Sequence, residues 1–148
     1  MASCQHSPEP LHAPRILVAD DNEDTLCLME TLLSRAGYVV NSATDGEEAW
    51  EALRSAPYDL LLSDHNMPRL CGLDLVARMR AAGMMLPVIV DSGSPEIGQA
   101  SDYPSLALSA VLHKPMDLTE VLDSVRLVLP PPQRHDLQLT PQPIHCHK

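Results

Sequence analysis

The sequence lacks several patterns that mark common functional classes. Its 148 residues include no Phe, and only 3 Tyr and 1 Trp occur, so no aromatic surface for stacking bases is indicated. Lys and Arg together number 10 against 20 Asp and Glu, and this formal net charge of −10 disfavours binding to phosphate backbones. We therefore expect no nucleic-acid partner.

Long apolar runs and paired cysteines are also missing. No apolar stretch approaches the roughly 20 residues of a membrane-spanning helix, and the start, MASCQHSPEPLHAP, lacks the basic and then apolar pattern of a signal peptide. The 4 Cys form no CxxC pair, which indicates neither a zinc site nor a disulfide framework. We expect a cytoplasmic protein with no membrane partner, with reduced cysteines and a buried Cys27.

The hydrophobic patterning divides the chain into three parts. Residues 1–14 show little periodicity and are expected to form a flexible leader, and the Pro-rich residues 130–148 are expected to form a disordered tail. Residues 15–129 alternate apolar runs with amphipathic stretches and suit one core.

Five apolar runs in residues 15–129 predict strands, and the stretches after them predict helices. The predicted strands are 15–19, 38–43, 60–63, 87–91 and 110–113. Apolar residues at helical spacing and capping residues predict helices at 23–36, 45–56, 73–82 and 117–129. The fourth helix in chain order has a weak signal because Gly98 and Pro104 interrupt it, so we expect only a short helix near 96–101.

This alternation of five strands with five helices predicts an α/β fold. The arrangement that suits it is a flavodoxin-like (βα)5 doubly wound parallel sheet with strand order 2-1-3-4-5.

Polar side chains stand at the ends of four predicted strands. Asp20 and Asp21 follow the first strand, Asp64 the third, Ser92 the fourth and Lys114 the fifth. Each alone also fits an ordinary turn or helix entry, but parallel strands share their carboxyl ends, so all should meet at one sheet edge. Clustered carboxylates repel one another, and a hard cation such as Mg²⁺ relieves that repulsion. The pattern predicts a divalent-metal site with room for a phosphoryl group.

Four blocks of sequence resemble the receiver domain of two-component response regulators of the chemotaxis-regulator kind. They are ILVADDNEDTL, DLLLSDHNMPRLCGLDL, LPVIVDSG and VLHKPMDLTEVLDSV, and they run from Arg15 to Leu129. The resemblance implies that Asp64 is the phosphoacceptor and that Asp21 binds Mg²⁺ directly and Asp20 mostly through water. The backbone carbonyl of Asn66 would be a further metal ligand.

The resemblance also implies roles for two more residues and for the whole chain. Ser92 would donate a hydrogen bond to the phosphoryl group, and Lys114 would pair with another phosphoryl oxygen. The donor would be a histidine kinase or a histidine phosphotransfer protein, and the chain would catalyse only its own phosphorylation and dephosphorylation. Because nothing after Leu129 is long enough for an output domain, we expect output by contact with an unknown protein. The contact face would be the fourth helix, fifth strand and fifth helix, in a monomer or weak dimer.

Several positions depart from the family pattern or lie next to one of its site residues. Val111 occupies a position where family members commonly carry an aromatic switch residue, and Tyr103 is a candidate replacement, although a loop aromatic is the commoner reading. Asp91 places a carboxylate just before Ser92, and strand alternation predicts that it points away from Ser92. His65 either contacts the phosphoryl group or is an ordinary loop residue.

Two other functions compete with a phosphorylated switch. A receiver that has lost phosphorylation would serve as a constitutive docking module, which Val111 leaves open. A metal-dependent phosphohydrolase of the haloacid dehalogenase type ranks far lower, because Asp20-Asp21-Asn22 is not the DxD arrangement that such enzymes carry after the first strand.

Overall fold

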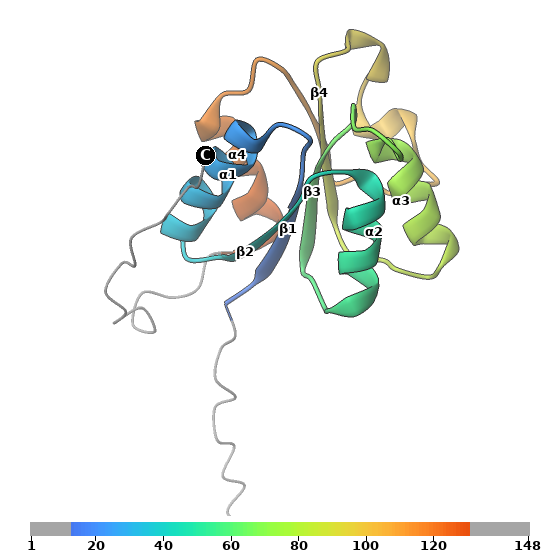
Figure 1. Cartoon of the computed structure of the whole chain (residues 1–148). Helices are drawn as coiled ribbons and strands as arrows, with labels where there is room; N and C mark the ends of the chain where they lie inside the picture. The colour runs from blue at the N-terminus through green and yellow to red at the C-terminus, as the bar shows by residue number, and fades with distance from the viewer. Residues whose placement is uncertain (1–12, 131–148) are drawn as a thin grey trace, which may run out of the picture.

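The computed structural model describes residues 13–130, which form five strands and four α-helices (Figure 1). The strands are β1 (Arg15–Ala19), β2 (Val39–Ala43), β3 (Leu60–Asp64), β4 (Val88–Ser92) and β5 (Ala110–His113). The helices are α1 (Glu23–Arg35), α2 (Gly46–Ser55), α3 (Gly72–Ala81) and α4 (Leu118–Val128). The predicted leader and tail lie almost wholly outside the described residues.

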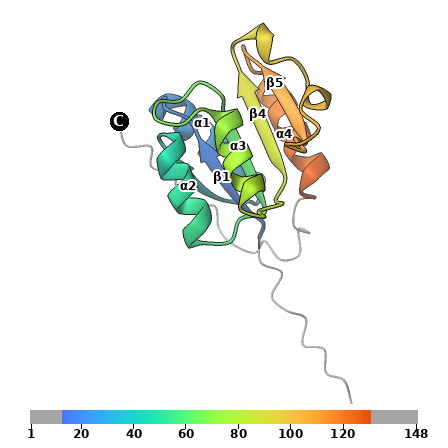
Figure 2. The ribbon, with the colours of Figure 1, turned by 90° about the vertical axis from the view of Figure 1, so that its right-hand side faces the viewer.

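The sheet is parallel throughout and has the order β2-β1-β3-β4-β5, which confirms the predicted flavodoxin-like topology. Helices α1 and α4 cover one face, and α2 and α3 cover the other (Figures 1 and 2). Every residue of β3 and β4 is buried, as expected of central strands covered on both faces.

Two aliphatic layers make up the core, one on each face of the sheet. Alternation along β1 sends Ile16 towards α1 and α4 and Leu17 towards α2 and α3. Leu and Val from the strands, together with Met29 and Met79 from the helices, fill the volume that Phe occupies in many other proteins. The large side chains at these positions are almost fully buried, so the strand ends are held rigidly.

The fourth βα unit corrects the prediction of five α-helices. In place of a helix near 96–101 the chain forms two 3₁₀ turns, η1 (Pro95–Ile97) and η2 (Ala100–Asp102). Gly98 lies between them with φ of 77°, a conformation that interrupts any helix. The predicted fifth helix is therefore α4, and η1 with η2 stands where the fourth helix was expected.

Side-chain hydrogen bonds hold this irregular segment in place. The Tyr103 hydroxyl donates to the Ile97 carbonyl at 2.6 Å, and the Arg80 guanidinium donates to four backbone carbonyls. These acceptors are Met84, Leu86, Leu106 and Ala107, at 2.8, 2.9, 2.8 and 3.3 Å. Arg80 thus fastens the end of α3 to the loops before β4 and before β5.

The described residues also bear on the cysteine and membrane expectations. Cys27 is only part-buried, so the prediction that it is buried is wrong. Its place on α1, between buried Leu26 and exposed Leu28, turns it to the edge of the helix's packed face. Cys71 is a free, part-buried thiol. Among residues 13–130 no helix has the length and apolar character needed to cross a membrane.

Candidate functional site

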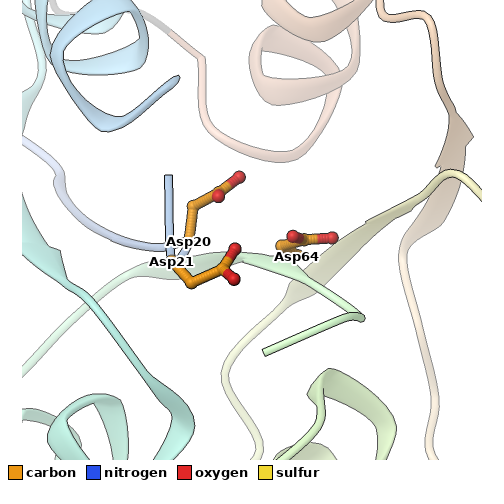
Figure 3. A group of neighbouring side chains, drawn as sticks. All are labelled: Asp20, Asp21 and Asp64. Atoms are coloured by element: carbon orange, nitrogen blue, oxygen red, sulfur yellow. The ribbon is translucent and has the colours of Figure 1, made fainter. Parts of the chain in front are cut away.

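Three carboxylates gather at the carboxyl edge of the sheet, as the strand ends predict. Asp20 and Asp21 follow β1, Asp64 ends β3, and one oxygen from each lies within 4.8 Å of the others (Figure 3). Asp20 and Asp64 are 2% and 3% exposed, whereas Asp21 is exposed. Two buried like charges and one at the surface leave an opening towards solvent.

The donor set fits a hard divalent cation. The Asp20 carboxylate accepts a hydrogen bond from the Asn22 backbone N–H through Oδ1 at 2.8 Å, but its buried Oδ2 has no hydrogen-bond partner among the described residues. Burial raises the pKa of Asp20, and the charges of Asp64 and Asp21 add to that rise. A cation that takes oxygen ligands would relieve both the burial cost and the repulsion. Asn66, whose N–H donates to Asp64 Oδ1 at 3.3 Å, is exposed beside this opening.

Lys114 supplies the positive charge of the site. Its Nζ lies 3.4 Å from Asp64 Oδ2, and its backbone N–H donates to the Ser92 carbonyl at 2.9 Å. Burial opposes the ammonium charge, but the carboxylates of Asp64, Asp91 and Asp20 outweigh it and raise the pKa of Lys114. The site therefore has a protonated ammonium directly against Asp64 at neutral pH.

Asp91 is a fourth carboxylate of the site, which the sequence analysis noted beside Ser92 but did not assign to the site. The β3–β4 register sets Asp91 beside Asp64, so both side chains project from the same face of the sheet. Asp91 is 4% exposed, and its Oδ1 lies 3.8 Å from Lys114 Nζ. Burial first, and then the Asp64 charge, raises its pKa to about 7. One signal was present: Asp91, like Asp64, ends a continuous apolar run.

Ser92 lies at the site, but its hydroxyl bonds its own loop. The Oγ atom accepts from the Ser94 backbone N–H at 3.0 Å, an ordinary turn interaction. Beside it is a cavity of about 400 Å³, whose lining includes Gln99, His113 and Lys114. The structure thus brings Ser92 to the edge of the site with its hydroxyl bonded to the Ser94 backbone.

Two residues of the loop after β3, close to Asp64 in the sequence, have structural roles at the start of α3. His65 Nδ1 accepts a hydrogen bond from the Leu73 backbone N–H at 3.4 Å, so His65 helps to cap α3, where Cys71 makes no side-chain cap bond. Gly72 is required there because a Cβ atom would lie 2.6 Å from the Asp64 carbonyl oxygen. In this arrangement the His65 ring is hydrogen-bonded to the backbone of α3.

Residues 16–126 match the family described as the response regulator receiver domain. Because this match covers most of the chain, the protein belongs to that family. The chain is 35% identical over 115 residues to the response regulator MprA of Mycobacterium ulcerans (strain Agy99), covering 78% of this chain and 50% of that protein. It is 31% identical over 113 residues to the sensor protein EvgS of Escherichia coli (strain K12), covering 74% of this chain and 9% of that protein. The chain thus spans about half or less of these relatives.

Solved structures agree with the family assignment. The response regulator TrrA of Thermotoga maritima, solved in complex with Mg²⁺ and BeF, superposes with a TM-score of 0.71 at 29% identity, covering 78% of this chain and 99% of that one. The chemotaxis response regulator CheY4 of Vibrio cholerae gives 0.71 at 27% identity, covering 79% and 99%.

Proposed function

We propose that residues 15–129 are a phosphorylatable receiver whose acceptor is Asp64. The observation that carries the proposal is the placement of Asp64 between the carboxylate pair that follows β1 and the Lys114 ammonium, 3.4 Å away. A carboxylate that attacks phosphorus needs positive charge on both sides, because the phosphoryl oxygens are negative.

In the proposed reaction an Asp64 carboxylate oxygen attacks the phosphorus of a phosphohistidine donor. The phosphorus–nitrogen bond of the donor breaks, its electron pair returns to the imidazole, and an acyl phosphate remains on Asp64. Asp20, Asp21, Asp64 and the Asn66 carbonyl would hold Mg²⁺, which when bound supplies charge neutralisation for the phosphoryl oxygens. Lys114 pairs with another of those oxygens, and Ser92 turns from the Ser94 backbone to donate to a third.

The donor in this proposal is a histidine kinase or histidine phosphotransfer protein in the cytoplasm. Output is by contact with a further protein over the surface of η1, η2, β5 and α4. The closure of the Ser92 loop onto the phosphoryl group would shift the population between two arrangements of that surface.

Incubation of the purified protein with Mg²⁺ and acetyl phosphate, followed by intact-mass measurement, tests this function. We expect one phosphoryl group per chain, loss of the added mass with Asp64→Asn, and its retention with Asp123→Asn, which neutralises an exposed carboxylate on α4. No incorporation and no response to beryllofluoride would instead support a docking module. Sustained turnover of phosphoesters would support the phosphohydrolase.

A further inference from the structure

The Asp91 carboxylate is the one buried charge at the site for which the proposed reaction has no use. It lies in β4, directly beside Asp64 of β3 and on the opposite side from β1, which Asp20 and Asp21 follow. Asp91 is therefore on the Lys114 side of the acceptor, away from the metal-binding pair.

The surroundings of Asp91 leave its charge poorly compensated. Its Oδ1 is buried and has no hydrogen-bond partner within residues 13–130, and Lys114 Nζ at 3.8 Å is too far for a hydrogen bond. A buried carboxylate oxygen without a hydrogen bond costs stability, and such costs are typical of functional sites. The rise in the pKa of Asp91 to about 7 agrees with this geometry.

Lys114 is consequently shared between two carboxylates. It approaches Asp64 Oδ2 at 3.4 Å and Asp91 Oδ1 at 3.8 Å. Once Asp64 carries a phosphoryl group, the phosphoryl oxygens need the ammonium most, yet Asp91 still attracts it from the other side. A neutral residue in the place of Asp91 would leave Lys114 wholly available to the phosphoryl group.

We propose that Asp91 is a positioning residue that draws Lys114 away from the phosphoryl group, so that the site holds the group weakly and mainly from the metal side. This inference rests on the proposed function, and it concerns how strongly the site binds the anion. It implies that binding of the phosphoryl group by this receiver depends more strongly on Mg²⁺ than it would if Lys114 paired with the phosphoryl group alone.

Calorimetric titration of the full chain with beryllofluoride in saturating Mg²⁺ tests the inference. We expect Asp91→Asn to tighten beryllofluoride binding about tenfold, in line with close charge pairs, and to weaken Mg²⁺ binding severalfold when fluoride is absent. A merely structural role would not move the two affinities in opposite directions. Asp123→Asn, which changes the net charge equally at an exposed position, should leave both unchanged.

Two further variants complete the test. Asp91→Val removes the charge with a residue suited to a buried strand, so the same tightening is expected should the Asn variant fold poorly. In a Lys114→Gln background, Asp91→Asn should tighten binding less than about twofold, because Asp91 acts through Lys114. Unchanged or weaker beryllofluoride binding by both neutral variants, or an undiminished gain without Lys114, would overturn the inference. Failure of the unaltered protein to bind beryllofluoride would overturn the proposed function, and this inference with it.

Discussion

At the scale of single residues, the site brings buried carboxylates together at a cost to the metal-free fold. Burial raises the pKa of Asp91 from 3.8 to about 7 and also raises that of Asp20. The folded state then keeps protons that the unfolded state has released. The free energy of unfolding therefore falls as pH rises from 3.8 through about 7, and the cost of the Asp91 charge is fully present only above that pH.

Neutralising Asp91 should accordingly stabilise the metal-free protein, and more so at high pH. For Asp91→Asn in EDTA we expect a gain in the free energy of unfolding on the order of 2–4 kcal/mol at pH 8, because each pKa unit corresponds to about 1.4 kcal/mol. At pH 5 the gain should be clearly smaller, since folded wild-type protein already carries the proton. Urea unfolding at both pH values measures this. An equal gain at the two pH values would show that charge burial is not the cause.

At the scale of elements, the irregular fourth unit depends on a few hydrogen bonds instead of on helical packing. Arg80 of α3 satisfies carbonyls on both sides of that unit. Tyr103 packs against the same core cluster as Val111, and its hydroxyl holds the Ile97 carbonyl. Tyr103 thus joins that core cluster to the segment that follows Ser92, although the aromatic residue is missing from β5 itself.

Removal of the Arg80 guanidinium should loosen this unit. For Arg80→Met we expect a loss of about 2–3 kcal/mol in the free energy of unfolding, because several part-buried carbonyls lose a charged donor. Arg35→Met is the matched control, since Arg35 is exposed in the last turn of α1 and should cost less than about 1 kcal/mol. Urea denaturation compares the two variants, and equal losses would contradict the bridging role of Arg80.

At the scale of the whole molecule, the metal should act as a stabilising ligand. At a hundredfold excess over its dissociation constant, a ligand that binds only the folded state adds about 2.7 kcal/mol. We expect Mg²⁺ to raise the melting temperature and Asp20→Asn to remove most of the rise. Because a chain of net charge −10 also gains from salt screening, NaCl of matched ionic strength is the control. A rise that NaCl reproduces in full would speak against a specific metal site.

Much of this molecule could be predicted from its sequence. The apolar runs predicted the strands, and shared carboxyl ends predicted that Asp20, Asp21, Asp64 and Lys114 meet. The same reasoning places Asp91 at that edge, because it too ends an apolar run, but its position directly beside the acceptor depends on the register between β3 and β4. The role of His65 in capping α3 could likewise not be predicted, because it depends on the conformation of the loop between β3 and α3.

The central claim is that Asp64 takes the phosphoryl group. Borohydride reduces an acyl phosphate to an alcohol and so converts a phosphorylated aspartate into homoserine, which peptide mass spectrometry can locate in the sequence. After treatment with Mg²⁺ and acetyl phosphate, we expect homoserine at position 64 and at no other aspartate. Homoserine at Asp20, Asp21 or Asp91, or its absence from the whole chain, would contradict the account.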